Sequence, residues 1–338
     1  MLYPFTAIVG QELMKRAFLL NIINPNIGSI LLKGPEGIGR ATAARGISEI
    51  FPKIATTGCH FRCDPSEPEM LCYWCMQKLQ AGELSSHVDF PQLVDTVAVV
   101  SPEKFTGNII ESREESVGID FRKVVEVHHS DLLEIDTENF LKPGVATNLN
   151  RGILFIENLN QLDDDVVDIL VTMLDSKINI LTSDTAAIAH PAHFILIGTI
   201  NSDEWAINPK LERGITVHLD LSESQTLEER IEIMERRRDF ESNPEEFRKK
   251  YEVHQVALRH RITKARENLA NISTPDYLLR TLARIAVDFD IPESKAEKIE
   301  EVAQTLAAYY GRNSVASDDL AHALELIVPD ENIVTELM

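Results

Sequence analysis

All four cysteines of the 338-residue chain fall within one stretch, CHFRCDPSEPEMLCYWC. Their spacing is Cys-x3-Cys-x8-Cys-x2-Cys, and the residues are Cys59, Cys63, Cys72 and Cys75. Two close pairs joined by a short loop can fold onto one tetrahedral ion, and four thiolates suit Zn²⁺ in a closed structural site. The pattern predicts a small zinc insertion at residues 58–78, with His60 and His87 as bystanders. Reduced thiols without a metal, or a redox pair at the second Cys-x2-Cys, are the alternatives.

A glycine-bearing loop, GPEGIGRAT, occupies residues 34–42. Gly34 and Gly39 keep the glycine spacing of the phosphate-binding loop G-x-x-x-x-G-K-[ST], and Gly37 lies between them. In that loop the backbone N–H groups cradle the phosphates of a nucleotide. The apolar run SILLKG before it and the helical pattern after it provide the expected setting. The loop therefore predicts a backbone cradle, and a generic strand-turn-helix connection is the alternative.

The side chains that a phosphate-binding loop needs are missing. Arg40 stands where a lysine reaches the β and γ phosphates, and its planar guanidinium is poorly shaped for that point contact. Ala41 stands where a hydroxyl ligates Mg²⁺. Thr42 cannot take over, since one step along a helix turns a side chain by about 100°. These residues predict weakened binding of ATP or ADP with Mg²⁺.

The first two thirds of the chain alternate strands and helices, starting with a helix from about Gln11. The strand candidates are short, apolar and β-branched, as expected of a sheet that is buried on both faces. They are SILLKG (29–34), GILFI (152–156), HFILIGT (193–199) and GITVHLDL (214–221). The alternation predicts an α/β domain over residues 1–221, in which helices sandwich a parallel sheet.

After residue 221 the sequence shows helical spacing with dense charge, as in TLEERIEIMERRRDF. Several of these helices begin near Ser, Thr or Asp, and Gly311 follows one as a stop signal. Residues 222–338 are therefore predicted to form an all-helical domain. Residues from about 97 to 140 lack clean periodicity and are predicted to be a divergent insertion, with VGIDFRKVVEVHH as the most strand-like piece.

Charge and hydropathy exclude some classes of partner. The chain has 33 basic and 54 acidic residues, a formal charge of −21, which repels phosphate backbones and argues against a nucleic-acid partner. No run approaches the roughly 18 apolar residues that span a bilayer, and the N-terminus lacks the features of a secretion signal. Clustered cysteines are typical of a reducing compartment. We therefore expect a cytoplasmic protein without a membrane partner.

Several motifs, in order along the chain, resemble one family. They are YPFTAIVGQELMKRAFLLN (3–21), FLKPGVATNLNRGILFIENLNQLDDDVVDILVTML (140–174), AHPAHFILIGTIN (189–201) and FESNPEEF (240–247). Together with the glycine loop, they are similar to the I subunit of magnesium chelatase, a ring-forming AAA+ ATPase. The resemblance implies an AAA+ P-loop fold with a helical lid. It also implies a ring of I-like or D-like subunits, which works with a large tetrapyrrole-binding subunit to insert a metal into a tetrapyrrole.

The resemblance also implies roles for residues outside the glycine loop. The family's Walker B strand ends in Asp-Glu, where the first carboxylate holds Mg²⁺ through water and the second orients the attacking water. This chain has Glu157 and Asn158 there, and an amide cannot act as a general base. Asn201 matches the sensor-1 residue, which contacts the γ-phosphate or the water. An ordinary buried strand end is the alternative for Glu157 and Asn158.

Two basic residues match positions that act on the nucleotide from elsewhere. Arg213, in NPKLERGI, falls where the family has an arginine finger that is offered to the neighbouring subunit's nucleotide. Lys295, in PESKAEKI, aligns with the sensor-2 arginine and lacks its fork geometry. The alternatives are a surface arginine with a local carboxylate and a solvated lysine on a helix face.

The departures at the chemical positions favour a ring subunit that hydrolyses ATP weakly or not at all and that scaffolds or regulates metal insertion. An active ATPase motor of a magnesium or cobalt chelatase is the first alternative. The second is a degenerate AAA+ subunit like those of DNA clamp loaders, which also combine altered nucleotide sites with a four-cysteine zinc module.

Overall fold

The computed structural model describes residues 1–109, 141–182, 187–201, 207–221 and 226–328. The chain divides into two compact units. The first consists of Met1–Pro52, Ile195–Trp205 and Ile215–Met338, and the second of Lys53–Phe194 and Ala206–Gly214. The helices that follow residue 221 thus group with the N-terminal segment, and the domain boundary predicted at residue 221 stays a prediction.

Three parallel strands form the sheet of the first unit. β1 (Ile30–Gly34) pairs with β10 (Ile195–Asn201) on one side and with β11 (Val217–Asp220) on the other. Ile30 lies opposite both Ile197 and Val217, and all three side chains are buried. The predicted strands at 29–34, 193–199 and 214–221 are confirmed, with ends shifted by up to three residues.

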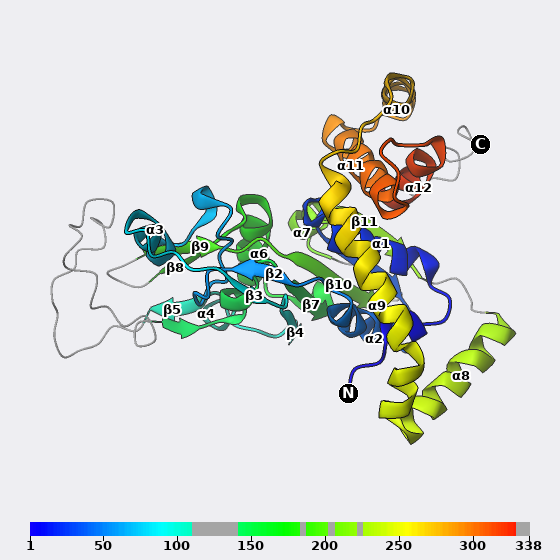
Figure 1. Ribbon diagram of the computed structural model, residues 1–338, viewed down its shortest axis with the longest axis horizontal. Helices are drawn as coiled ribbons and strands as arrows, with labels where there is room; N and C mark the ends of the chain where they lie inside the picture. Colours follow the sequence, from blue (N-terminus) through cyan, green and yellow to red (C-terminus); the bar gives the residue numbers. More distant parts are fainter. Residues whose placement is uncertain (110–140, 183–186, 202–206, 222–225, 329–338) are drawn as a thin grey trace. The chain divides into compact units, whose positions relative to one another are not determined.

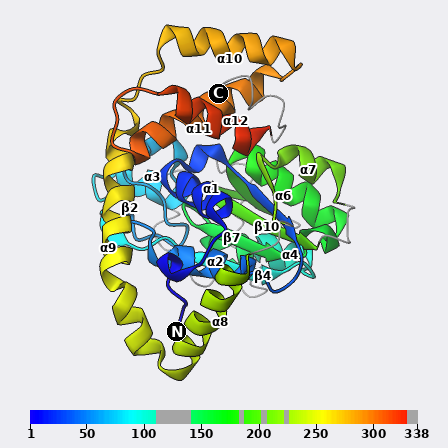
Figure 2. The same ribbon diagram turned by 90° about the vertical axis from the view of Figure 1, so that its right-hand side faces the viewer.

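Helices make up the rest of the first unit. They are α1 (Glu12–Ile23), α2 (Arg40–Gly46), α8 (Leu227–Ser242), α9 (Pro244–Leu269), α10 (Asp276–Asp288), α11 (Glu293–Tyr309) and α12 (Ser317–Ile327), with the short 3-10 helices η1 (Phe5–Ala7), η2 (Pro25–Ile27) and η3 (Ile47–Glu49). α11 packs against α12 and α9, and α1 packs against α9 and α11. Figures 1 and 2 show the long α9 passing beside α1 and reaching α11.

The predicted helix signals are found at the start of α8, at the end of α11 and at the start of α12. Thr226 caps α8 by a capping box, because its Oγ1 accepts from Glu229 N at 3.2 Å and its own N–H donates to Glu229 Oε2 at 2.9 Å. Gly311, with φ +71°, follows the end of α11 as predicted. α12 begins at Ser317, and its N-cap residue is Ala316.

The second unit contains two parallel strands, β4 (Leu93–Val97) and β7 (Ile153–Glu157). The remaining strands form three antiparallel pairs: β2 (Ile54–Thr56) with β3 (His87–Asp89), β5 (Gly107–Ile109) with β6 (Leu141–Pro143), and β8 (Ile178–Thr182) with β9 (Ala187–Pro191). Its helices are α3 (Tyr73–Gln80), α4 (Pro102–Thr106), α6 (Asp164–Ser176) and α7 (Pro209–Gly214), with η4 (Pro68–Met70), η6 (Val145–Asn148) and η7 (Leu159–Gln161).

Two glycines lie against each other where β5 and β6 meet. A Cβ added at Gly144 would lie 2.2 Å from Gly107 N, and one added at Gly107 would lie 2.8 Å from Gly144 N. Any larger side chain at Gly144 would have to move the backbone. Residues 110–140, between the two strands, lie outside the described part, and so does the predicted strand-like piece VGIDFRKVVEVHH.

Candidate functional site

The glycine loop connects β1 to α2 in the first unit, as the sequence predicts. Gly34 is the last residue of β1, and a Cβ there would lie 2.9 Å from Ile38 Cδ1. Gly37 and Gly39 have φ of +81° and +92°, in the left-handed region that glycine adopts without strain. Gly39 is also the N-cap of α2. The loop thus has a backbone conformation that a residue with a side chain would strain, and the predicted phosphate cradle stays a prediction.

Arg40 is directed into the sheet. Its side chain is buried, with 8 % exposure for the residue, and the guanidinium donates to Leu32 O at 3.3 Å and to Ile200 O. Nη2 donates to Asn201 Oδ1 at 3.0 Å, and Asn201 Nδ2 donates to Glu36 Oε1 at 3.3 Å. The residues at the predicted lysine and sensor-1 positions are therefore in direct contact. Glu36, which accepts the hydrogen bond from Asn201, places a carboxylate within the loop itself.

The other candidate residues of the first unit make no polar side-chain contact with this group that the structure records. Ala41 is half-buried and has no metal-ligating atom, and Thr42 is exposed one residue further along α2. Lys295 is exposed in the first turn of α11, where its backbone N–H donates to Pro292 O at 2.9 Å.

Glu157 and Asn158 lie at the carboxyl end of β7 in the second unit. Glu157 is the last strand residue and lies opposite Val97 of β4. Asn158 has φ +56°, in the left-handed region that asparagine tolerates better than most residues. Its carbonyl accepts from Gln161 N at 2.9 Å, which closes the turn of η7. The strand predicted at 152–156 is thus a buried strand that ends at Glu157 and is followed by Asn158, and its Walker B role stays a prediction.

Arg213 lies in the last turn of α7. The helix contacts α6, and Lys210 Nζ lies 2.6 Å from Asp168 Oδ1. Arg213 is exposed, and its Nε donates to Pro209 O of the same helix at 3.2 Å. Across the described residues no carboxylate pairs with its guanidinium, that of the adjacent Glu212 included. Arg213 therefore presents its cation to solvent.

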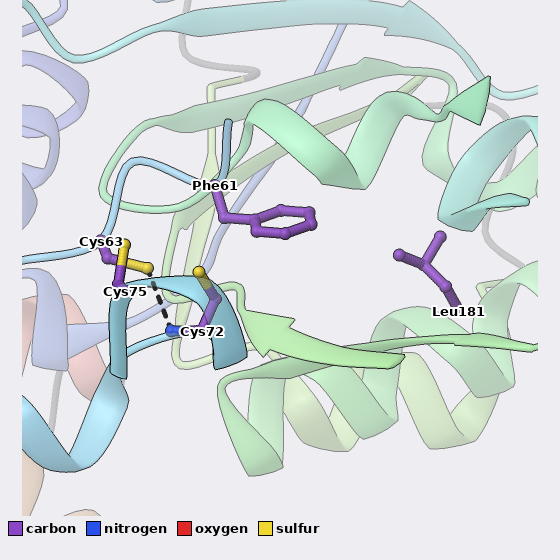
Figure 3. Packing of buried hydrophobic residues seen from close by; sticks show 5 residues of the cluster. All are labelled: Phe61, Cys63, Cys72, Cys75 and Leu181. Atoms are coloured by element: carbon purple, nitrogen blue, oxygen red, sulfur yellow. Dashed lines mark hydrogen bonds between the residues drawn. The ribbon is translucent and has the colours of Figure 1, made fainter. Parts of the chain in front are cut away.

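The four cysteines of the second unit come together. Their Sγ atoms all lie within 4.8 Å of one another, and no other His, Cys, Asp or Glu of the described residues joins the group. Cys63, Cys72 and Cys75 are buried and Cys59 is half-buried. Figure 3 shows the sulfur atoms of the three buried cysteines turned toward one another, with the Phe61 ring beside them. Four sulfurs at about 2.3 Å from one ion would be about 3.8 Å apart, so the arrangement fits a tetrahedral thiolate site.

Two of the four sulfur atoms have hydrogen-bonding partners besides the other cysteine thiols. The backbone N–H of Cys72 donates to Cys63 Sγ at 3.2 Å, and Thr57 Oγ1 lies 3.1 Å from Cys75 Sγ. Hydrogen bonds from Cys63 and the other two thiols lower the pKa of Cys59. Hydrogen bonding to Cys59 raises the pKa of Cys72. The other three thiols thus favour the thiolate form of Cys59, the most exposed of the four cysteines.

Comparisons with known proteins identify the family. The family model "Magnesium chelatase, subunit ChlI" matches residues 101–213. The magnesium-chelatase subunit ChlI homolog of Methanocaldococcus jannaschii is 34% identical over 97% of this chain and 85% of its own length. The chain belongs to the magnesium chelatase ChlI family. The chloroplastic subunit ChlI-2 of Arabidopsis thaliana is 31% identical over 97% of this chain and 74% of its own length.

A solved structure agrees with this assignment. The complex between subunits BchI and BchD of magnesium chelatase, built on a single-particle cryo-EM reconstruction, contains a chain that is 27% identical and matches with a TM-score of 0.51. The match covers 100% of this chain and 99% of that one. The predicted family and the predicted α/β fold, a parallel sheet flanked by helices, are confirmed, and the clamp-loader alternative is not supported. Within the described residues, no helix of this ChlI-family chain is long and apolar enough to cross a membrane.

A buried histidine lies beside the cysteines of this ChlI-family chain. His190 is 1 % exposed, and its ring stacks on Phe61 with centroids 4.1 Å apart. Nε2 lies 3.0 Å from Asn179 Nδ2, and Nδ1 lies 3.0 Å from Pro191 O. Asn179 Nδ2 also donates to Thr106 O, which fixes the amide orientation. The network therefore assigns a neutral ring protonated at Nδ1, and burial lowers the pKa of His190 to about 4.

This histidine should make the stability of the second unit depend on pH. Between its ordinary pKa of 6.5 and about 4, the unfolded chain binds a proton that the folded chain does not. The stability that the neutral His190 ring contributes is therefore fully present above pH 6.5. It is lost as the pH falls toward 4, by up to about 3 kcal/mol. We expect the free energy of unfolding, measured with urea, to fall more steeply from pH 7 to pH 5 for the wild type than for His190→Gln. Equal slopes for the two proteins would contradict this assignment.

The sequence alone did not single out three residues at these sites. Glu36 had a visible signal, because a carboxylate within a phosphate-binding loop is unfavourable for an anionic ligand. Thr57 and Asn150 had none, since their contacts with the cysteine segment depend on the fold. The partners of Asn150, Phe61 O and Arg62 O, lie 89 and 88 positions away in the chain.

Proposed function

We propose that this chain is an AAA+ subunit of a magnesium or cobalt chelatase that hydrolyses ATP weakly or not at all and that scaffolds or regulates metal insertion into a tetrapyrrole. The observation that carries the proposal is the environment of Arg40. Its guanidinium donates to two main-chain carbonyls of the sheet and to Asn201 Oδ1. A phosphate-binding lysine must instead present its charge to the β and γ phosphates.

The contact between Arg40 and Asn201 supports the proposal in two ways. Hydrogen bonds to the buried guanidinium must break before it can turn toward a nucleotide, and charge-assisted hydrogen bonds are stronger than neutral ones. The same contact occupies the amide oxygen of Asn201, which the family resemblance assigns to the γ-phosphate or the attacking water. Two further residues support the proposal. Asn158 has no carboxylate that could act as a general base, and Ala41 has no hydroxyl that could ligate Mg²⁺.

One observation favours retained nucleotide binding. The loop keeps glycine at Gly37 and Gly39, whose left-handed φ values a side chain would strain. A backbone cradle needs no side chains, so ATP or ADP binding without efficient turnover is the form of the proposal we favour. An active motor subunit remains the second candidate.

We propose that the subunit acts within a ring of I-like or D-like AAA+ subunits and with a large tetrapyrrole-binding subunit. The matched solved structure is a complex of subunits BchI and BchD, which supports partners of this kind. In such a ring Arg213 would be offered to the nucleotide of a neighbour. Its exposure and the absence of a paired carboxylate in the described part of the chain suit that role.

We also propose that Cys59, Cys63, Cys72 and Cys75 hold a structural Zn²⁺. The cluster fits the ion, because four sulfurs converge, three of them buried, and hydrogen bonds reach two of them. With four protein ligands no position is left for a reactive water, so the site would stabilise the fold and take no part in ATP hydrolysis.

The test of the function is calorimetric titration of the purified chain with ATP and Mg²⁺, followed by a phosphate-release assay with and without a catalytically active I subunit. We expect ATP to bind and the chain alone to release phosphate slowly. We also expect the chain to change the rate of the active subunit when the two are mixed. Brisk turnover by the isolated chain would refute the proposal and favour the motor subunit.

A further inference from the structure

The turn between the first two cysteines has an unfavourable backbone conformation. Arg62 has φ +52°, although it is not a glycine. The turn is closed by a hydrogen bond from Arg62 N to Cys59 O at 3.1 Å, and Cys63 O accepts from Thr57 N at 3.0 Å. A left-handed arginine costs free energy relative to an extended or helical one, so something else must hold the turn.

The side chain of Asn150 binds two further carbonyls of this turn. Its Nδ2 donates to Phe61 O at 3.1 Å and to Arg62 O at 3.3 Å. Its Oδ1 accepts from His193 N at 3.1 Å. The residue is 3 % exposed, so water does not compete well for these groups. Both amide hydrogens and the amide oxygen are therefore used.

The backbone that carries Asn150 is itself fixed. Arg151 N donates to His193 O at 2.6 Å, and a Cβ added at Gly152 would lie 2.4 Å from Gln92 O. Arg151 Nη2 also forms an ion pair with Asp64, the residue after Cys63, at 2.8 Å. Asn150 thus extends from a tightly packed segment immediately before β7, which lets it set the position of the turn.

We infer that Asn150 is a positioning residue for the metal ion at the four cysteines. The inference rests on the proposed zinc site and goes beyond it by assigning a residue that touches no sulfur. The amide keeps Phe61 and Arg62 in the turn that directs Cys59 and Cys63 toward the other two thiols. Supporting residues of this kind typically contribute about 10–100-fold to metal affinity.

Cobalt(II) titration of the full-length chain tests the inference, because tetrahedral cobalt thiolate sites give characteristic absorption bands. We expect wild type to bind one Co²⁺ per chain. Asn150→Asp, which removes both donors, and Asn150→Ala, which does so without burying a charge, should bind Co²⁺ about 10–100-fold more weakly and with shifted bands. Chelator competition measures the affinity, and circular dichroism measures the folded fraction used for normalisation.

Asn21→Asp is the matched control. Asn21 is 1 % exposed in the other unit, where its Nδ2 donates to Ala17 O at 3.0 Å, so the variant buries a carboxylate away from the cysteines. We expect it to lower stability and leave the Co²⁺ affinity and bands of the folded chain unchanged. Wild-type affinity and bands in both Asn150 variants would overturn the inference and leave the metal site intact. Failure of wild type to bind Co²⁺ or Zn²⁺ would overturn the metal site, and the inference with it.

Discussion

Replacing Asn158 by glutamate, in a chain that also carries Arg40→Lys and Ala41→Thr, is expected to raise ATP hydrolysis by about 10²–10⁴-fold over the chain with the last two changes alone. On the proposed roles of these two positions, the lysine would contact the phosphates and the hydroxyl would ligate Mg²⁺. On the same proposal, the glutamate would supply the carboxylate that orients the attacking water. Steady-state phosphate release at saturating ATP measures the effect.

The backbone at Asn158 affects how this experiment should be designed. Its φ of +56° suits asparagine, and a glutamate there costs about 1–2 kcal/mol of folding free energy. Asn158→Asp is the milder companion variant, because aspartate also adopts the left-handed region. We expect it to keep more thermal stability and to gain less activity, since its carboxylate is on a shorter side chain.

Asn160→Glu, in the same Arg40→Lys and Ala41→Thr background, is the matched control. It makes the same chemical change two residues further on, within η7 rather than at the strand end. We expect no gain in phosphate release. If the chain with Asn158→Glu binds ATP as tightly as its parent and hydrolyses it no faster, the missing base is not what limits hydrolysis.

Arg213→Ala is expected to lower the ATP hydrolysis of a neighbouring active I subunit by about 10³–10⁵-fold at each nucleotide that depends on this arginine. The assay mixes the chain with an I subunit whose own finger arginine has been removed, so that only Arg213 can supply the charge. The melting temperature of the chain should barely change, because the side chain is exposed and bonds only to Pro209 O of its own helix among the described residues.

Two variants separate a finger from a general effect of surface charge. Lys210→Ala removes a cation from the same helix, but one that is paired with Asp168. It should leave hydrolysis by the partner unchanged. Arg213→Lys keeps the charge, loses the fork geometry and should recover only part of the rate. Equal losses from Arg213→Ala and Lys210→Ala would exclude the finger role.

The sequence predicts the parts of the fold whose residues are apolar over a whole element. β1, β7 and β10 consist mainly of buried isoleucine and leucine, and α10 and α12 carry clear apolar periodicity. β2, β3, β5 and β6 are three-residue strands, too short for any period to show. β2 also pairs with a strand that follows the cysteine segment, so its partner could not be inferred from neighbouring residues.

The sequence predicts which elements carry the candidate residues better than it predicts the contacts of their side chains. Spacing alone places Gly34 and Gly39 between a strand and a helix, and it brings four cysteines to one point. The inward direction of Arg40 could not be predicted, because its partners Ile200 and Asn201 lie 160 and 161 positions away. The sequence shows that Arg40 replaces the lysine of the loop, but it does not show which groups accept hydrogen bonds from the guanidinium.

The close approach of Gly107 and Gly144 has a consequence for how chains of this kind can vary in length. The pairing of β5 with β6 places Ile109 opposite Leu141, so these two chain positions are held close together. Joining two ends that are held together costs little more for a longer chain, since the closure entropy grows only with the logarithm of the number of residues. Insertions and deletions between these glycines can therefore accumulate without disturbing the rest of the molecule, as long as both glycines are kept.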